Sequence, residues 1–190
     1  MEHAEHNSHN ETSALKIALN LVCATLISGL ILGVIYAATH KIAEQKQVEL
    51  KQASMISLVQ ADEFKEIEGQ AEWYEALKDG QLVAYILPAE GKGYGGTIAI
   101  LVAISPEMTV LKYTITEAAE TPGLGAKAAE PLFSDQFIGK DTEHLVVTKD
   151  PSQKDLIQSI SGSTITSRAV TNAIKESVEQ LSAFVQEGGK

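Results

Sequence analysis

Hydrophobic positions first gather in one uninterrupted run near the N-terminus, over residues 17–39 (IALNLVCATLISGLILGVIYAAT). The run carries no charged side chain, and roughly 20 apolar residues in a helix are enough to span a bilayer. A cleaved signal peptide would have a shorter apolar core, more basic residues before it and a small-residue cleavage site after it. Because Lys16 is the only lysine or arginine before the run, the pattern favours a retained transmembrane helix.

Two polar or small features interrupt this apolar run. Gly29 and Gly33 form a GxxxG spacing, which lets a second membrane helix approach closely. Asn20 is a polar group inside the run and can form a hydrogen bond to such a helix. Glycine pairs are also common in membrane helices. The GxxxG spacing therefore indicates either a contact with a specific partner helix or only the usual composition of such helices.

The residues before the run, 1–16, form a polar tail. His3, His6 and His9 recur every three residues in it, a spacing that can clasp a metal ion. No cysteine accompanies these histidines, so we favour a disordered tail without a metal.

The residues after the run, 40–62, mix charged and apolar positions and are expected to form a helical stalk. Their apolar positions are only partly periodic, so the pattern does not establish packing on a partner. Lys41, Lys46 and Lys51 follow the membrane run, whereas Lys16 precedes it. By the positive-inside rule, this distribution favours the C-terminal domain on the cytoplasmic side.

From residue 63 to residue 190, short apolar stretches separated by turn residues predict one folded domain. Asp79-Gly80 lies between two such stretches and is typical of a hairpin turn. Residues 97–104 (TIAILVAI) are continuously apolar, which predicts a buried strand after the glycine-rich loop 91–96 (GKGYGG). We expect strands over residues 73–77, 81–87, 97–104, 109–116 and 145–148.

The last long segment, residues 166–186, has the spacing of an amphipathic helix. Its apolar face comprises Val170, Ile174, Val178, Leu181 and Val185. Hairpin strands combined with helices predict an α+β fold for the domain.

Composition excludes several classes of function. The chain has 190 residues with 15 basic and 25 acidic side chains, a formal net charge of −10. Arg168 is its only arginine, so a nucleic-acid partner is not expected. The single cysteine, Cys23, rules out an internal disulfide or a cysteine metal cluster. His144 has no obvious partner and is expected to be a structural or surface histidine.

Three glycine-bearing loops are the candidate functional segments: 91–96, 120–125 (ETPGLG) and 161–167 (SGSTITS). The last loop places five hydroxyl side chains just before the final helix. Serine and threonine satisfy the free N–H groups of a helix N-terminus as caps, and one cap needs one hydroxyl. The same N–H groups also stabilise a bound phosphate, so capping and phosphate binding are the two interpretations.

The segment SISGSTITSRAV resembles the flavinylation motif of membrane flavoproteins that have an FMN-binding domain. Among these, the chain is most similar to the G subunit of Rnf-type electron-transport complexes, a relative of the C subunit of the sodium-pumping NADH:quinone reductase. ETPGLG, the GYGG loop before an apolar strand and a single N-terminal anchor follow in the same order as in that family. The resemblance extends over nearly the whole chain from about residue 17.

The resemblance implies that Thr164, which closes Ser-Gly-x-Thr, carries FMN through a phosphoester bond on its hydroxyl. Ser163 stands where the family usually has alanine, and Gln158 stands where it usually has aspartate, with Asp155 three residues out of place. If that aspartate helps the modifying enzyme to recognise the site, attachment is slower or incomplete here. With the flavin ring against the turn 121–125, the expected cofactor site comprises Thr164, Ser161, Gly162, Ser163, Thr166, Ser167, Glu120, Thr121, Gly123, Leu124 and Tyr94.

The resemblance also implies a function for the whole chain. It is expected to be an electron carrier in a membrane-bound ferredoxin:NAD oxidoreductase coupled to sodium or proton movement, with other membrane and iron–sulfur subunits as partners. A separate FAD-dependent flavin transferase would install the FMN. One alternative is a subunit of a related NADH:quinone reductase; another is a membrane-tethered assembly or binding module whose SGSTITS segment only caps a helix.

The family places its flavin domain on the extracytoplasmic side of the inner membrane, against the lysine count. Long domains translocate largely regardless of their charge, and the positive-inside bias acts mainly through short flanking loops. The expected orientation therefore follows the family.

Overall fold

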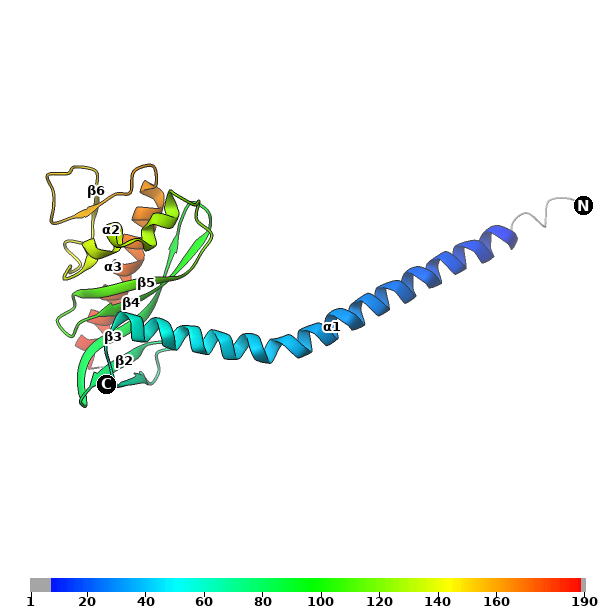
Figure 1. Cartoon of the computed structure of the whole chain (residues 1–190), viewed down its shortest axis with the longest axis horizontal. Helices are drawn as coiled ribbons and strands as arrows, with labels where there is room; N and C mark the ends of the chain where they lie inside the picture. The colour runs from blue at the N-terminus through cyan, green and yellow to red at the C-terminus, as the bar shows by residue number, and fades with distance from the viewer. Residues whose placement is uncertain (1–7, 189–190) are drawn as a thin grey trace, which may run out of the picture. The chain divides into compact units, whose positions relative to one another are not determined.

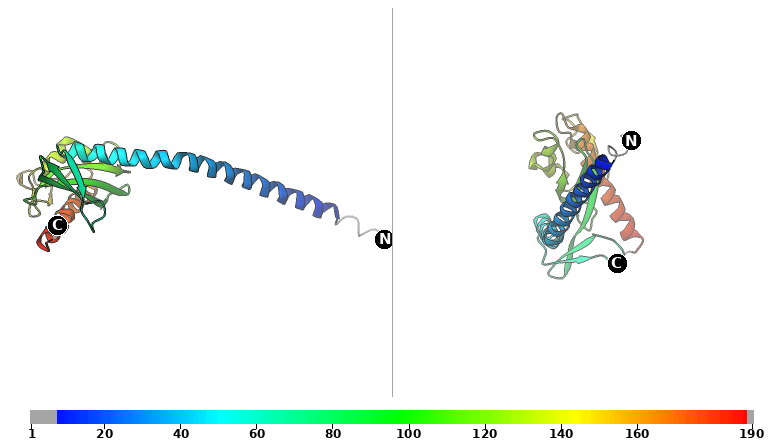
Figure 2. Two further views of the ribbon diagram at one scale, coloured as in Figure 1. Left: turned by 90° about the horizontal axis from the view of Figure 1, so that it is seen from below. Right: turned by 90° about the vertical axis from the view of Figure 1, so that its right-hand side faces the viewer.

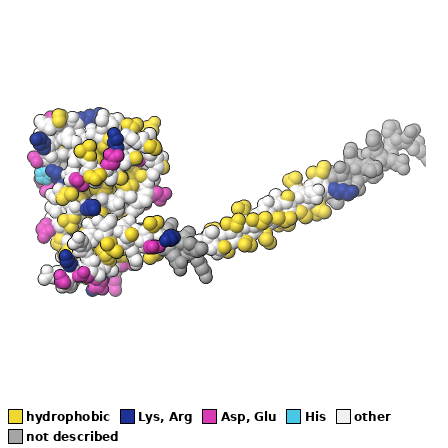
Figure 3. Space-filling model, viewed as in Figure 1, with side chains coloured by type: hydrophobic (Ala, Val, Ile, Leu, Met, Phe, Trp, Pro, Cys, Tyr) yellow, Lys and Arg dark blue, Asp and Glu magenta, His cyan; other side chains and the backbone are white. Residues whose placement is uncertain are grey.

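The computed structural model describes residues 8–188, and of these the side chains of residues 16–40, 46 and 48–188. One helix, α1 (Ser8–Leu58), contains the apolar run and most of the predicted stalk. Its segment Lys16–His40 has a mean hydropathy of 2.3 and no buried side chain, and is long and apolar enough to cross a membrane. Hydrophobic side chains lie along this segment in Figure 3. The side chains of His3, His6 and His9 lie outside those described.

The chain divides into two compact units, Met1–Leu50 and Lys51–Lys190. The second unit begins within α1, since Met55 and Leu58 are buried against the sheet of that unit. Lys51 joins the same unit through an ion pair of 2.7 Å with Glu72. The domain boundary expected between residues 62 and 63 therefore moves to residue 51, because the end of the helix supplies core residues.

The centre of the second unit is a five-stranded antiparallel sheet whose strands follow one another in chain order (Figure 1). Its strands are β1 (Glu63–Glu66), β2 (Tyr74–Lys78), β3 (Gln81–Lys92), β4 (Thr97–Ile104) and β5 (Val110–Ala118). Asp79 and Gly80 join β2 to β3 with φ of 51° and 76°. Positive φ at both positions is the geometry of a tight hairpin turn, so this predicted turn is confirmed.

Strand β4 lies between two hydrophobic layers, as its unbroken apolar sequence predicts. Ile98, Ile100, Val102 and Ile104 belong to a core that α3 (Thr164–Gln186) completes, while Leu101 and Ala103 belong to the layer with Met55 and Leu58. Figure 2 (right) shows α3 along one side of the sheet. Because both faces are covered, hydrophobic residues are needed at consecutive positions.

Helix α3 buries Val170, Ile174, Val178 and Leu181 completely. The fifth residue of the predicted apolar face, Val185, is 37% exposed, because it lies in the last turn of the helix beyond the core. The α+β prediction is confirmed.

Short elements connect β5 to α3: η1 (Gly125–Ala129), α2 (Pro131–Ser134), η2 (Asp135–Phe137), β6 (Val147–Thr148) and β7 (Ile157–Gln158). Strands β6 and β7 pair in parallel over two residues each. The predicted strand 145–148 is thus shorter, since Leu145 is buried as a core residue without joining the ladder.

Strand β3 is longer than the predicted 81–87, because Gly91 and Lys92 pair with Ile98 and Thr97 of β4. A Cβ on Gly91 would lie 2.5 Å from the backbone oxygen of Ala169, which is in α3. Glycine here lets the helix pack directly on the strand. Only residues 93–96 of the expected loop 91–96 remain outside the strands.

Candidate functional site

The three glycine-bearing loops lie around one cavity of about 740 Å³. Its lining comes from the β3–β4 turn, the loops after β5, β6 and β7, and the first turn of α3. The lining residues are Tyr94, Glu120, Thr121, Leu124, Gly125, Lys149, Gly162, Ser163, Thr164, Ile165 and Thr166. A cavity of this size and mixed lining is typical of a site for a small organic molecule.

Glu120 connects the three loops through its two carboxylate oxygens. Oε1 accepts a hydrogen bond of 3.2 Å from the backbone N–H of Gly95, and Oε2 accepts one of 2.9 Å from the hydroxyl of Thr166. Thr166 is 1% exposed, so its hydroxyl depends on this partner inside the protein. Glu120 therefore fixes the β3–β4 turn and the start of α3 to its own loop.

Two glycines leave the space that the Glu120 side chain occupies. A Cβ on Gly93 would lie 2.0 Å from Oε1 of Glu120, and a Cβ on Gly125 would lie 2.1 Å from Oε2. Both distances are far below contact distance, so a side chain at either position would displace the carboxylate. Neither glycine has a positive φ, so glycine is needed here for the packing of the Glu120 side chain and not for the backbone conformation.

The first turn of α3 contains the predicted attachment residue. The helix begins at Thr164, two residues earlier than expected, with Ser163 at the N-cap position. The Ser163 side chain makes no cap hydrogen bond. Ser167 accepts a hydrogen bond from the N–H of Ile160 and donates one to the oxygen of Ser163, both of 2.9 Å. Capping of α3 thus does not account for the hydroxyl cluster.

Thr164 lines the cavity with a partly exposed side chain. Within residues 8–188, its hydroxyl makes no hydrogen bond, in contrast to the hydroxyls of Thr166 and Ser167. The N–H groups of the first helical turn precede the first intrahelical bond, which runs from Ser167 N–H to the oxygen of Ser163 at 2.9 Å. A free hydroxyl and free amides are therefore next to each other at one end of the cavity.

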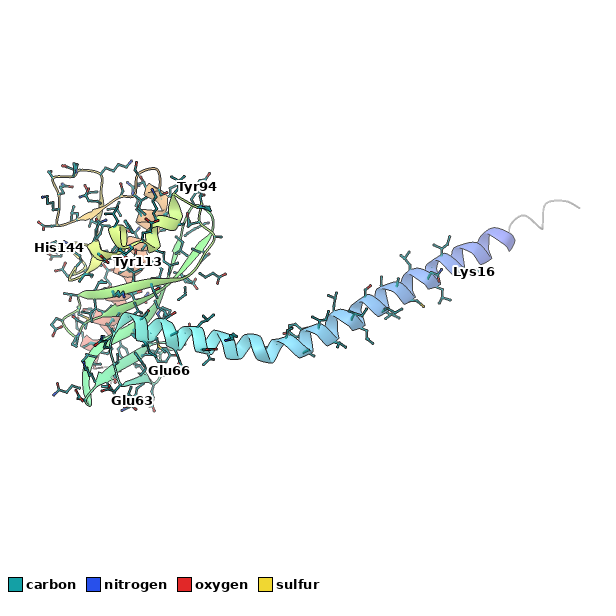
Figure 4. All side chains as sticks on the ribbon, viewed as in Figure 1. Lys16, Glu63, Glu66, Tyr94, Tyr113 and His144 are labelled. Atoms are coloured by element: carbon teal, nitrogen blue, oxygen red, sulfur yellow. The ribbon has the colours of Figure 1, made fainter. Side chains whose placement is uncertain are left out.

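Exposed apolar side chains line the remainder of the cavity. Tyr94 is 75% exposed, Ile165 is 56% exposed and Leu124 is 43% exposed. Figure 4 shows Tyr94 at the turn between the long strands of the hairpin. Gly162 has φ of +79°, and a Cβ there would lie 3.2 Å from Cδ2 of Leu124. Leu124 and the Gly162 backbone are therefore in close contact on one wall.

The structure brings most of the expected site residues together and leaves three outside the lining. Ser161 is exposed before the helix, Ser167 is fully buried beneath it, and Gly123 supports the turn with φ of +75°. Gly125, Lys149 and Ile165 line the cavity without having been among the expected site residues. Gly125 and Ile165 belong to the two motifs, whereas nothing in the sequence marks Lys149, which lies 15 positions before Thr164.

His144 was expected to be a structural or surface histidine, and its half-exposed side chain does belong to a local hydrogen-bonded turn. Its Nδ1 lies 2.7 Å from Oδ1 of Asp141, which also accepts the N–H of Glu143 at 3.0 Å. These bonds, the one from His144 first, hold the pKa of the Asp141 carboxyl below its ordinary value. They close a local turn away from the cavity lining. No group of three or more metal-ligating side chains occurs among the residues that the structure describes.

Comparison with known proteins identifies the family of the domain that contains this cavity. Residues 93–179, which include the β3–β4 turn 93–96 and the loops 120–125 and 161–167, match the family model of the FMN-binding domain. The chain is 43% identical over 182 residues to the G subunit of the proton-translocating ferredoxin:NAD(+) oxidoreductase complex of Clostridium ljungdahlii. That alignment covers 95% of this chain and 97% of the relative. The chain belongs to the G-subunit family of these ion-translocating complexes.

Other members of the G-subunit family are more distant. The chain is 37% identical to the G subunit of the Na(+)-translocating complex of Acetobacterium woodii, covering 75% of this chain and 67% of the relative. It is 29% identical to the G subunit of the ion-translocating complex of Methanosarcina acetivorans, covering 91% and 96%. A crystal structure of the C subunit of Na(+)-translocating NADH-quinone reductase from Parabacteroides distasonis has a TM-score of 0.49 and 31% identity, covering 60% of each chain.

Proposed function

We propose that this G-subunit protein carries FMN covalently on Thr164 and relays electrons within a membrane-bound ferredoxin:NAD oxidoreductase. The observation that carries the proposal is the free Thr164 hydroxyl, which lies at the N-terminus of α3 and lines the cavity. FMN supplies one- and two-electron redox chemistry when it is bound, and the protein supplies position and electrostatic environment.

The phosphate end of the flavin fits the first turn of α3. Free N–H groups and the helix dipole favour an anion there. No side-chain cap from Ser163 competes for these groups. In the attachment reaction, Thr164 Oγ1 forms a bond to the flavin-side phosphorus of FAD, the pyrophosphate bond breaks, AMP leaves with the bonding electrons, and the hydroxyl proton passes to a base of the transferase.

The ring end of the flavin fits the apolar walls. Leu124 and Ile165 offer aliphatic contacts, and Tyr94 offers an aromatic face from the β3–β4 turn. Glu120 and the glycines beside it keep these walls at a fixed separation. These residues hold and orient the cofactor, while Thr164 prevents its loss from an exposed domain.

The apolar segment Lys16–His40 would anchor the domain to the membrane and bring it to other subunits of the complex. The relatives are named for either proton or sodium translocation, so the complex is proposed to couple electron transfer to movement of one of these ions. We place the flavin domain on the extracytoplasmic side, where a flavin transferase would modify it.

Denaturing gel electrophoresis tests the proposal at low cost. The full chain, co-expressed with a flavin transferase, should give a fluorescent band, because a phosphoester bond survives denaturation. Thr164→Val removes the hydroxyl at nearly constant volume and should give no fluorescence. Fluorescence of equal intensity from Thr164→Val, or none from the wild type while the transferase labels another substrate, would contradict the proposal.

A further inference from the structure

Among the residues that line the cavity in which we propose the flavin, Lys149 is the one with a positively charged side chain. It follows β6 directly and its side chain is exposed to solvent. The neighbouring carboxylate of Asp150 accepts hydrogen bonds from the N–H and the hydroxyl of Ser152, at 2.9 and 2.7 Å. The bond from the Ser152 hydroxyl lowers the pKa of Asp150. Within the described part of the chain, Lys149 forms no ion pair, so its charge is available to a ligand.

The loop that carries Lys149 is held by Gln158. The side-chain amide of Gln158 donates to the backbone oxygen of Asp150 at 3.1 Å and to that of Gln153 at 2.9 Å. These two bonds use both N–H donors of the amide. Thr148 adds a bond of 2.6 Å from its hydroxyl to the side-chain oxygen of Gln153. Both ends of the loop 149–154 are thus fixed to β7.

An aspartate at position 158 could not make these contacts. A carboxylate only accepts hydrogen bonds, so it would leave the oxygens of Asp150 and Gln153 without their donor. Gln158 therefore has a structural role in this chain that the usual residue of the motif would not fulfil.

We propose that Lys149 binds the flavin phosphate at Thr164 and that Gln158 is the residue that positions it. The inference rests on the proposed function, since it concerns the phosphate of the attached FMN. A phosphodiester at Thr164 keeps one negative charge, and the free amides of α3 would contact it from one side. Lys149, which lines the same cavity, supplies the opposite charge.

Phosphorus NMR of the flavin-loaded full chain, in a phosphorus-free detergent, tests this pairing. Lys149→Gln removes the charge, and Lys154→Gln is the matched control, because Lys154 is an exposed lysine of the same loop that does not line the cavity. We expect the phosphodiester resonance to shift in Lys149→Gln and to stay in place in Lys154→Gln. Lys149→Arg, which keeps the charge, should lie closer to the wild type.

The rate of labelling by the transferase provides a second measurement. We expect Lys149→Gln to slow it roughly two- to fivefold at low salt, the range of an exposed ion pair. The difference should shrink as salt screens the charges. Gln158→Leu should shift the resonance in the same direction, and the double variant should shift it no further than Lys149→Gln alone.

The outcomes separate this inference from the proposed function. A wild type without covalent flavin contradicts the proposed function itself. The role of Lys149 is overturned if the wild type is labelled and Lys149→Gln has the same phosphodiester resonance and the same labelling rate as Lys154→Gln. A shift in Lys149→Gln together with an unshifted Gln158→Leu overturns the positioning role of Gln158.

Discussion

The hydroxyl of Thr166 donates a hydrogen bond of 2.9 Å to Oε2 of Glu120, across 46 positions of the chain. This bond joins the first turn of α3 to the loop after β5, and the same carboxylate accepts the N–H of Gly95 from the β3–β4 turn. One side chain thus determines how three glycine-bearing loops enclose the cavity.

Removal of the Glu120 carboxylate should destabilise the domain. Glu120→Ala leaves the buried Thr166 hydroxyl without its partner, so we expect the free energy of unfolding to fall by about 1–3 kcal/mol. Urea denaturation of the full chain measures the change. Thr166→Val is the matched variant, and the double variant should cost less than the sum of the two. Additive costs would show that the two residues do not stabilise the fold through one another.

A methyl group at position 125 should be poorly tolerated while Glu120 is present. Its Cβ would lie 2.1 Å from Oε2, so the carboxylate must move and its bond to Thr166 must weaken. We expect Gly125→Ala to reduce both stability and flavin labelling. In a Glu120→Ala background the added cost should be smaller, since the clash with the carboxylate is gone and only the approach of 2.9 Å to Cβ of residue 120 remains. An equal cost in both backgrounds would assign the glycine a different role.

In the membrane segment, Gly29 and Gly33 are predicted to contact a helix of another subunit. Replacing both by leucine should weaken co-purification of membrane subunits without unfolding the domain, because bulky side chains hold a neighbouring helix away. Ala38→Leu adds comparable bulk about 140° around the helix from Gly33 and is the control. Unchanged co-purification in the double variant would show that the two glycines do not form a helix contact.

The side of the membrane can be measured with a protease. We expect the domain to be cut in cells whose outer membrane is permeabilised while the inner membrane stays intact, because the proposed orientation is extracytoplasmic. Cleavage only after the inner membrane is opened would agree with the positive-inside rule and contradict this orientation. A cytoplasmic marker protein that remains uncut controls for leakage.

Local patterns predicted strands β2 to β5 and the last helix, because these elements follow from neighbouring residues. Strand β1 (Glu63–Glu66) was not predicted, since it has four mostly polar residues and depends on pairing with β2. The unbroken apolar run gives β4 its bounds of Thr97–Ile104, and Asp79-Gly80 marks the hairpin turn. The paired strands β6 and β7 have only two residues each, too few for a periodic signal. The core role of Met55 depends on contact with strands that lie later in the chain, which a stalk-like sequence does not reveal.

The site was predicted as three motifs, and only the structure relates them. The distance between Glu120 and Thr166 depends on how the loops pack, and no spacing in the sequence encodes it. Lys149 was missed for the same reason, since an isolated surface lysine looks like any other charged loop residue. From the sequence, Gln158 was interpreted only as a departure from the motif. Its hydrogen bonds to the backbone oxygens of Asp150 and Gln153 depend on the pairing of β6 with β7, which the sequence does not indicate.

The central claim, that Thr164 carries the flavin, is tested most directly by peptide mass spectrometry. Cleavage after Lys154 and Arg168 releases the peptide 155–168, which contains Thr164 and the neighbouring hydroxyl residues. After co-expression with a flavin transferase, fragmentation should locate the mass of FMN, less one water, on Thr164. Thr164→Ala should release an unmodified peptide, whereas Ser161→Ala should still be modified. An unmodified wild-type peptide, or an increment located on another residue of it, would contradict the account.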